Sequence, residues 1–403
     1  MKTIQRCEYL DWLKRWKDKQ IIKVVSGVRR CGKSTLFDIY KGYLLSTGVE
    51  QKQIISINFE DFEFSHLENS SSLYQHIKSL LNDDVMNYIF LDEIQHCKNF
   101  EKAVDSLFIK DNCDVYITGS NAYFMSGELA TLLSGRYVEI QMLPLSFKEF
   151  VLSLEEPYSK LTDAEKFNLY ITYGSFPFIA KYNSFNEDSK DYINGIFDTV
   201  LNKDIARRLN ITDTASLENV AKFLLYSIGN KISATKIANT LKSSGKSVDQ
   251  KTVDKFLKGL TESMLFYKVQ RFNIKGKQFL TTQSKYYTVD VGMRNSIVKS
   301  AQSDIGHILE NIVFLELKRR YKNVYVGEQD SGEVDFVVFD GKKYEYYQVS
   351  ATTLDENTLK RELAPFTEIR DNYPKYLLTL DTLLPNENYG GVVKLNALEW
   401  LLK

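Results

Sequence analysis

Apolar runs alternate with amphipathic stretches through the first 143 residues of the chain. Between the runs, apolar residues recur at the three- and four-residue spacing of helices. Nearly all-apolar strands that alternate with helices are typical of a parallel sheet covered on both faces. We therefore predict an α/β domain over residues 1–143, opened by an amphipathic helix. The predicted strands cover residues 21–25, 54–61, 88–93, 115–121 and 137–143, with helices at 36–40, 73–81 and 100–108.

The pattern changes after residue 143, and three further regions follow. Residues 144–214 show helical spacing rich in Tyr and Phe without strand alternation, which predicts a helical lid. Residues 215–300 combine short helices with two β-like stretches, the order of a winged helix-turn-helix. Residues 301–403 begin with a long helix and continue into a hairpin and a later strand. This last region predicts a second α/β unit.

Composition places the chain among ordinary globular proteins. Of its 403 residues, 43% are hydrophobic and 26% are charged, and the net charge of zero argues against a uniformly basic nucleic-acid coat. The four cysteines form no CxxC pair, so we expect reduced thiols. No apolar run approaches the roughly 18 residues of a membrane span, and the N-terminus has no signal-peptide pattern. We therefore expect a cytoplasmic protein without a membrane partner.

A glycine-rich loop joins the first predicted strand to the first helix after it. The loop matches G-x-x-x-x-G-K-[ST] at every fixed position, which predicts a phosphate cradle. Its backbone N–H groups and the helix start attract phosphate, Lys33 would reach the β- and γ-phosphates, and Ser34 would offer its hydroxyl to Mg²⁺. A coincidental turn is the alternative, and the flanking strand and helix disfavour it. The nucleotide-binding residues are Gly27, Val28, Arg29, Arg30, Cys31, Gly32, Lys33, Ser34 and Thr35.

Two carboxylates end the predicted strand over residues 88–93. Asp92 would hold Mg²⁺, largely through water, and Glu93 would orient and partly deprotonate the attacking water. Acidic residues also end strands as ordinary turn residues. The pair therefore indicates a catalytic site only in combination with the phosphate loop. Asn121 ends the next strand, where it would position the same water or contact the γ-phosphate. A simple strand-end turn is the alternative for Asn121.

The region over residues 215–290 is strongly basic, with 13 Lys and Arg residues against 5 Asp and Glu. Several lysines lie in or near its second long helix and in a plausible wing, and lysines are good phosphate contacts. DNA binding here would be salt-sensitive and mostly independent of sequence. A protein–protein module with a solvated lysine face is the alternative. The lysines are Lys246, Lys251, Lys255, Lys258, Lys275 and Lys277.

Acidic residues near the carboxyl end follow the order of a PD-(D/E)xK nuclease site. Glu310 lies on a predicted helix, Asp335 in a strand, and Gln348-Val349-Ser350 in the next strand. The expected acid and lysine of this last motif are replaced by Gln and Ser, which weakens metal binding and removes the cation. Lys342 or Lys360 could take the cationic role. We expect a nuclease-like fold that has lost cleavage activity.

On these motifs the chain resembles AAA-type ATPases. It is most similar to a large prokaryotic family of predicted ATP-binding proteins that carry a nuclease-like domain of unknown function at the carboxyl end. The resemblance implies a Walker A loop, a Walker B pair at Asp92 and Glu93, and a first sensor at Asn121 or Ser120. It also makes Arg136 a catalytic candidate, as an arginine finger or sensor. The resemblance to this family rests on residues 27–34, 88–93, 118–121, 133–136, 144–147, 310–313 and 332–336.

Arg136 has two possible roles. An arginine finger supplied in trans would require a homo-oligomer, whereas an Arg after a Ser-Gly turn could equally pair with a structural carboxylate.

The sequence therefore predicts a protein that binds and hydrolyses ATP with Mg²⁺. It would act as a nucleotide-driven switch or motor on a macromolecular client, for which DNA is one candidate. One alternative is a metal-dependent nuclease that ATP regulates. Another is an interaction scaffold that holds nucleotide without turning it over.

Overall fold

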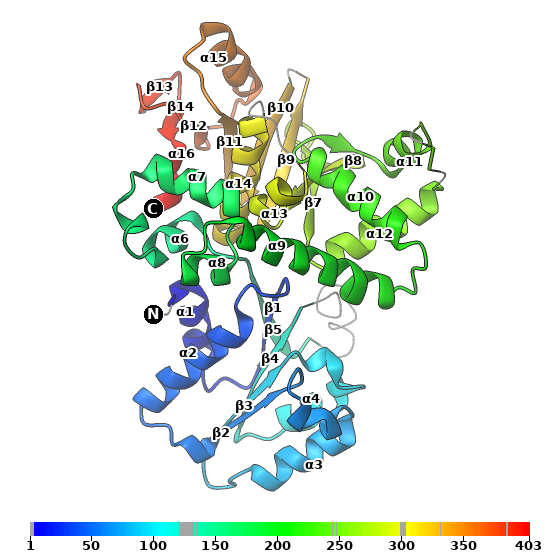
Figure 1. Cartoon of the computed structure of the whole chain (residues 1–403). Coiled ribbons are helices and arrows are strands. Elements are labelled where there is room, and N and C mark those ends of the chain that lie inside the picture. Colours follow the sequence, from blue (N-terminus) through cyan, green and yellow to red (C-terminus); the bar gives the residue numbers. More distant parts are fainter. Residues whose placement is uncertain are drawn as a thin grey trace. The chain divides into compact units, whose positions relative to one another are not determined.

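The computed structural model describes residues 4–120, 133, 135–243, 245–246, 248–298, 304–330, 332–383 and 386–403, without the side chains of residues 281 and 282. The chain divides into two compact units (Figure 1). The first extends to Pro144, and the second covers most of Leu145–Lys403. Each unit contains its own sheet.

The first unit is built on a five-stranded parallel sheet with the order β2-β3-β4-β1-β5. The α/β fold with a parallel sheet is therefore confirmed. Its strands are β1 (Ile22–Gly27), β2 (Ile54–Asn58), β3 (Asn87–Asp92), β4 (Cys113–Gly119) and β5 (Tyr137–Met142), and its helices are α1 (Cys7–Trp16), α2 (Lys33–Ser46), α3 (Ser70–Leu80) and α4 (Phe100–Phe108).

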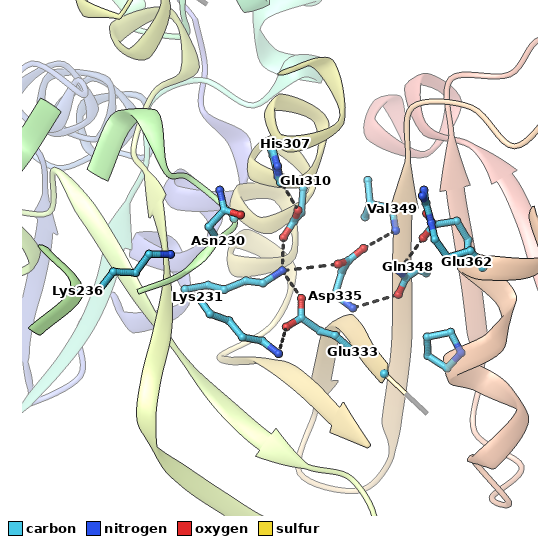
Figure 2. A pocket seen from close by; sticks show the side chains of 15 residues that line it. Asn230, Lys231, Lys236, His307, Glu310, Glu333, Asp335, Gln348, Val349 and Glu362 are labelled. Atoms are coloured by element: carbon cyan, nitrogen blue, oxygen red, sulfur yellow. Dashed lines mark hydrogen bonds and ion pairs between the residues drawn. The ribbon is translucent and has the colours of Figure 1, made fainter. Parts of the chain in front are cut away.

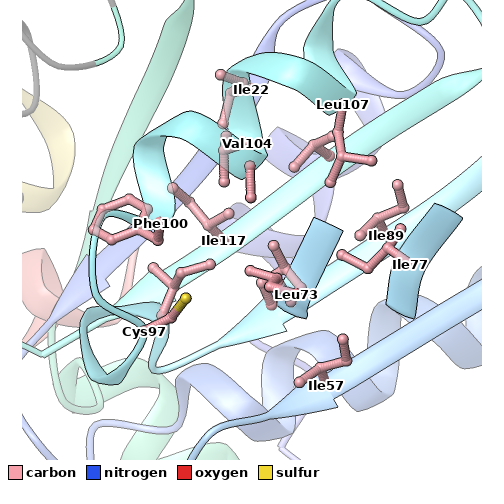
Figure 3. Packing of buried hydrophobic residues seen from close by; sticks show 14 of the residues in the cluster. Ile22, Ile57, Leu73, Ile77, Ile89, Cys97, Phe100, Val104, Leu107 and Ile117 are labelled. Carbon is pink, nitrogen blue, oxygen red and sulfur yellow. The ribbon is translucent and has the colours of Figure 1, made fainter. Parts of the chain in front are cut away.

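The two faces of this sheet bury different side chains, because successive residues of a strand point to opposite faces. On one face, Ile22, Ile89 and Ile117 join Leu73 of α3 and Val104 of α4 in a fully buried cluster (Figure 3). Each such side chain contributes about 1.5–3 kcal/mol when it leaves water. This apolar cluster covers one face of the sheet from β1 to β2.

The opposite face packs against α2 and contains a buried polar network. Phe37 of α2 meets Phe90 of β3 with ring centroids 5.1 Å apart. Beside them, Lys23 of β1 forms a fully buried ion pair with Asp114 of β4. The Tyr116 hydroxyl donates to Asp114 at 2.7 Å, and the hydroxyls of Tyr40 and Tyr116 lie 3.0 Å apart. The network joins β4 to β1 and α2, the two elements that flank the phosphate loop.

We predict that Asp114→Ala destabilises the first unit by about 3–5 kcal/mol, because it leaves the ammonium of Lys23 buried without its partner. Chemical denaturation monitored by circular dichroism measures the loss. The exposed Asp83→Ala serves as the control and should stay within about 0.5 kcal/mol of wild type. Equal stability of the two variants would contradict a structural role for the network.

The second unit contains a nine-stranded mixed sheet with the order β13-β14-β12-β11-β10-β9-β7-β8-β6. Its strands are β6 (Lys231–Ile232), β7 (Phe266–Asn273), β8 (Gln278–Thr288), β9 (Asn323–Gln329), β10 (Gly332–Phe339), β11 (Tyr344–Ser350), β12 (Lys375–Thr379), β13 (Glu387–Tyr389) and β14 (Val392–Asn396).

Helices occupy the first part of this unit and also separate the strands. Two of them begin with a capping box, Ser146 with Glu149 at α6 and Thr162 with Glu165 at α7, which satisfies the free N–H groups of the first turn. The helices of the second unit are α6 (Phe147–Ser153), α7 (Asp163–Tyr173), α8 (Pro177–Tyr182), α9 (Glu187–Thr199), α10 (Thr214–Tyr226), α11 (Ala234–Ser243), α12 (Gln250–Glu262), α13 (Val291–Ile297), α14 (Ile305–Arg320), α15 (Glu356–Leu363) and α16 (Ala397–Leu402).

Strands β7 and β9 join two regions that the sequence pattern treats separately. They pair in parallel through Arg271–Val326, Phe272–Gly327 and Asn273–Glu328, so the strands before residue 290 continue into the carboxyl-terminal sheet. The division of this unit into a lid, a winged helix and a nuclease-like domain stays a prediction. Within the described part of the chain, no helix combines the length and the apolar character needed to cross a bilayer.

Candidate functional site

The candidate site forms where β1, β3 and β4 end. In a parallel sheet these carboxyl ends meet at one edge, and β4 lies between β1 and β3. The phosphate loop follows β1, Asp92 ends β3 with Glu93 directly after it, and Gly119 ends β4. The strand order therefore brings together three motifs that lie far apart in the sequence.

The phosphate loop has the backbone conformation that its glycines suggest. Gly32 adopts a φ of 105° directly before α2, and Arg30 also lies in the left-handed region with a φ of 68°. A β-carbon on Gly27 would lie 2.4 Å from the carbonyl oxygen of Met142. Gly27 is thus required for the close contact between the loop and β5, and Gly32 for the turn into the helix.

Lys33 is buried and folds back over the loop. Its Nζ donates to the carbonyl oxygen of Gly27 at 3.1 Å and forms an ion pair with Oε1 of Glu93 at 3.1 Å. Burial opposes the charge on Glu93, but Lys33 and the hydrogen bonds from Gln95 and Ser120 outweigh it and lower the pKa of Glu93 to about 2. The Glu93 charge likewise outweighs burial at Lys33 and raises its pKa. Both groups are therefore charged at neutral pH.

Asp92 and Ser34 provide oxygen donors of the kind that Mg²⁺ prefers. The Ser34 hydroxyl, at the exposed start of α2, hydrogen-bonds the Asp92 carboxylate, and the Thr118 hydroxyl donates to the same group. Burial raises the pKa of Asp92 despite these bonds. A dication beside Asp92 would reverse this effect of burial. The hydroxyl and carboxylate oxygens thus fit the predicted ion.

Ser120 and Gln95 hold the second oxygen of Glu93. The Ser120 hydroxyl donates to Oε2 at 2.8 Å, and the Gln95 side-chain amide donates to the same oxygen at 2.5 Å. Ser120 was one of the two positions expected for a first sensor, and Asn121 lies outside the described residues. Gln95 carries no sequence motif, and only its place two residues after Glu93 could have suggested this contact.

Arg136 lies at the opposite edge of the sheet from the phosphate loop. Its carbonyl oxygen accepts from the N–H of Ile22 at 2.9 Å, so it flanks the start of β1, whereas the loop follows the end of that strand. The length of β1 separates these two edges by roughly 17 Å. The half-exposed side chain lies 3.7 Å from Oδ1 of Asp105. Arg136 therefore lies too far away to act in the nucleotide site of its own chain. A role for Arg136 in the site of another subunit stays a prediction.

Arg6 supports the phosphate loop in a way that the sequence pattern does not reveal. The buried guanidinium donates to the carbonyl oxygen of Cys31 at 3.1 Å and to that of Leu143 at 2.6 Å. The Tyr9 hydroxyl accepts from the N–H of Leu143 at 3.1 Å. The N-terminal segment thus connects the loop to the end of β5. Burial raises the pKa of the Cys31 thiol in the same loop, which disfavours its reactive thiolate.

The remaining loop residues occupy the surface or support the backbone. The Val28 carbonyl oxygen lies 3.4 Å from the Lys33 ammonium, and Arg29 forms an ion pair with Glu60 at 2.6 Å. Thr35 is exposed in the first turn of α2.

A second cluster of charged side chains lines a pocket of about 700 Å³ in the second unit (Figure 2). The structure brings together Glu310 of α14 and Asp335 of β10, two acids of the predicted nuclease-like site, and adds Glu333 of β10 to them. Lys285 of β8 pairs with these acids, and Lys231 of β6 also pairs with Glu333 at 3.0 Å. Lys360 is instead exposed and pairs with Glu356, and Lys342 is exposed.

The acids of this pocket differ in their affinity for protons. Burial opposes the charge on Glu310, but Lys285 and several hydrogen bonds outweigh it and lower its pKa to about 2. Burial and the neighbouring Glu310 raise the pKa of Asp335 well above its usual value. Gln348, at the position of the missing acid, donates to Glu362 at 2.8 Å. The pocket therefore contains a further carboxylate that no motif indicates.

Part of the positive charge over residues 215–290 is neutralised within the second unit. Lys231 and Arg271 pair with Glu328, Lys275 pairs with Asp330, and Lys285 pairs with Glu310 and Glu333. Four of the thirteen basic side chains therefore contact acids of the following region. Of these four, Lys275 is one of the lysines of the predicted DNA surface.

Comparisons with known proteins agree with the fold of the first unit. The family described as "AAA domain" matches residues 19–151, and the family described as "Domain of unknown function (DUF8612)" matches residues 164–304. The Walker-type ATPase PABY2304 of Pyrococcus abyssi is 13% identical and has a TM-score of 0.53. That match covers 73% of this chain and 96% of the solved chain, and at this identity it supports the fold alone.

Two curated proteins match over most of their length. An uncharacterized protein of Haemophilus influenzae is 39% identical over 403 residues, which is 99% of each chain. Uncharacterized protein MJ1544 of Methanocaldococcus jannaschii is 32% identical over 360 residues, 86% of this chain and 78% of its own.

Over residues 19–151 the first unit is thus similar to AAA domains, and its sheet order and phosphate loop agree with the fold of a Walker-type ATPase. The chain as a whole belongs to the family that includes the H. influenzae protein and MJ1544.

We predict that Gly27→Ala abolishes ATP binding and lowers the stability of the first unit by about 1–3 kcal/mol. The added methyl group would displace the backbone of Met142 and with it the loop. ATP titration by calorimetry and thermal unfolding measure the two effects. Gly42→Ala, on α2 with no neighbouring atom within 4 Å, is the control and should bind ATP normally. Wild-type ATP affinity in Gly27→Ala would contradict the assigned loop geometry.

Proposed function

We propose that the protein is a Mg²⁺-dependent ATPase that acts as a nucleotide-driven switch or motor on a macromolecular client. The observation that carries this proposal is the convergence of Lys33, Asp92 and Glu93 at one edge of the sheet, with Lys33 and Glu93 3.1 Å apart. A phosphate-binding cation, a metal-binding carboxylate and a carboxylate base are the groups that phosphoryl transfer to water requires.

The ion pair between Lys33 and Glu93 indicates what ATP must change on binding. Glu93 is a poor base while Lys33 holds it, because its pKa lies at about 2. The β- and γ-phosphates would draw the Lys33 ammonium toward themselves and remove the main cause of this low pKa. Glu93 would then regain proton affinity when the γ-phosphate is in place. Substrate binding itself would thus activate the base.

Hydrolysis would proceed by in-line attack of a water molecule on the γ-phosphorus. Glu93 would accept the proton of this water, while Ser120 and Gln95 fix its second carboxylate oxygen. Lys33 and the N–H groups at the start of α2 would stabilise the negative charge of the phosphates. Ser34 and Asp92 would hold Mg²⁺, which supplies charge neutralisation at the phosphate oxygens.

In this proposal, the second unit would contact the macromolecular client. Its order of helices and strands over residues 215–300 supports a winged helix, and the acids around Glu310 support a degenerate nuclease-like fold. DNA binding through this region, a homo-oligomer that presents Arg136 in trans, and a cytoplasmic location remain proposals. A non-hydrolysing scaffold is the alternative that the measurements below distinguish, since it would bind ATP without releasing phosphate.

We predict that Lys33→Ala weakens ATP binding by roughly 10- to 100-fold, because it removes a charge-assisted hydrogen bond to phosphate. Equilibrium binding of labelled ATP measures the change. Lys41→Ala alters a lysine of the same helix that pairs with Asp38, and it should bind ATP as wild type does. Equal affinity of Lys33→Ala and wild type would refute the assigned phosphate site.

We predict that Glu93→Gln lowers the turnover number by roughly 10²–10⁴-fold, because the amide cannot accept a proton from water. Phosphate release at saturating Mg²⁺ and ATP measures the loss, with the exposed Glu63→Gln as the matched control. Unchanged turnover in Glu93→Gln would show that another group is the base. Wild-type phosphate release at the level of the buffer blank would favour the scaffold.

A further inference from the structure

The side chain of Gln95 reaches the Glu93 carboxylate from the turn that follows β3. Gln95 lies in the short 3₁₀ helix Ile94–His96, and Glu93 directly before it adopts a left-handed backbone conformation with a φ of 52°. Ile94 is fully buried in the apolar cluster of the first unit, and the N–H of Cys97 donates to the carbonyl oxygen of Ile94 at 2.9 Å. The backbone on both sides of Gln95 is therefore fixed by the core.

The orientation of the Gln95 amide is set by its two polar neighbours. Its Nε2 donates to Oε2 of Glu93 at 2.5 Å and to the hydroxyl oxygen of Ser120 at 3.4 Å. Ser120 uses its own proton for Glu93, so its oxygen is left to accept. An ionised carboxylate accepts hydrogen bonds and cannot donate them. The N–H side of the amide must therefore face Glu93 and Ser120, and its carbonyl oxygen must face away from them.

The carbonyl oxygen of this amide, Oε1 of Gln95, is a buried acceptor without a donor. It is shielded from solvent, and no group of the described residues donates a hydrogen bond to it. A buried acceptor that stays unpaired is unfavourable, so such an atom beside a reaction site calls for a partner. Oε1 lies within about 5 Å of the Glu93 carboxylate, because an amide separates its nitrogen and oxygen by about 2.3 Å. One water molecule can bridge two acceptors at this separation, since an O–H···O bond spans about 2.8 Å.

We propose that Oε1 of Gln95 accepts a hydrogen bond from the water that attacks ATP, so that Gln95 orients this water together with Glu93. The inference rests on the proposed ATPase function. One proton of the water is directed to Gln95 and the other to the Glu93 carboxylate that Lys33 has left, which turns a lone pair of the water oxygen toward the γ-phosphorus.

The reaction step then balances without any further reactant. The water oxygen forms a bond to the γ-phosphorus, the bond from the γ-phosphorus to the terminal oxygen of ADP breaks, and Glu93 takes one proton of the water. The other proton stays on the phosphate formed and keeps its hydrogen bond to Gln95. Gln95 itself neither gains nor loses a proton.

Phosphate release and ATP affinity of the full-length chain, measured side by side, test this inference. Gln95→Met removes both polar atoms at nearly constant side-chain length. Gln51→Met is the matched control, because Gln51 is an exposed glutamine in another 3₁₀ helix of the same unit, Gln51–Gln53. Phosphate release is followed at saturating Mg²⁺ and ATP, ATP affinity by calorimetry, and folding by thermal unfolding. The same substitution in a Glu93→Ala chain separates contact with the water from mere support of Glu93.

The expected result is that Gln95→Met lowers the turnover number by roughly 10- to 100-fold and leaves ATP affinity within about twofold of wild type, because the bond to the water acts during attack and not in nucleotide binding. Gln51→Met should match wild type in both measurements. In the Glu93→Ala chain, Gln95→Met should lower the residual turnover further. If Gln95→Met does not fold, Gln95→Asn replaces it and should show the same loss, since its amide ends one methylene group short of Glu93.

Wild-type turnover in Gln95→Met would overturn the inference. A loss of turnover that disappears in the Glu93→Ala chain would overturn it too, because Gln95 would then act only through Glu93. Phosphate release by the wild-type chain at the level of the buffer blank would instead overturn the proposed function, and this inference with it.

Discussion

The ion pair between Lys33 and Glu93 is the interaction on which the candidate ATPase site depends. It joins the phosphate loop after β1 to the acidic end of β3, and it lowers the pKa of Glu93 to about 2. The pair forms because β4 separates these strands while all three end at the same edge. A buried lysine and a buried glutamate each stabilise the charge of the other, so neither can change partner without affecting the second. In the proposed mechanism, phosphate recognition by Lys33 and activation of Glu93 would therefore be coupled through this one contact.

The surroundings of this pair are rigid. Arg6 connects the loop to the end of β5, and the buried Lys23–Asp114 pair joins β1 to β4 beneath it. Ser120 and Gln95 fix the second carboxylate oxygen of Glu93. The strands that carry the site are buried on both faces, so they cannot shift without opening the core. In the proposed mechanism, the group that moves when nucleotide binds is the ammonium of Lys33, which would leave Glu93 for the phosphates.

Much of the first unit could be predicted from the sequence because its signals are local. Apolar runs indicate the five strands, and the loop over residues 27–34 specifies its own conformation through Gly27 and Gly32. Arg6 and Gln95 could not be predicted, since their contacts depend on how the chain returns to the loop. Arg136 is the reverse case, a residue that the sequence suggests for the nucleotide site but the structure places elsewhere. Its position before β5 sets it at the far edge of the sheet.

The second unit shows why non-local contacts escape a motif search. Lys285 precedes Glu310 by 25 residues and lies in a region that its pattern assigns to another domain. Only the pairing of β7 with β9 brings the two regions into one sheet. The Gln348-Val349-Ser350 stretch has no lysine, and Lys285 of β8 pairs with Glu310 and Glu333 in the same pocket.

In the proposed mechanism, ATP must draw Lys33 away from Glu93 before Glu93 can act as the base. The most direct test is the affinity of Glu93→Gln for ATP, measured by calorimetry beside its rate of phosphate release. The account predicts that this variant binds ATP several-fold more tightly than wild type, because Lys33 no longer has a competing partner, while its turnover falls. Weaker ATP binding together with unchanged turnover would contradict it.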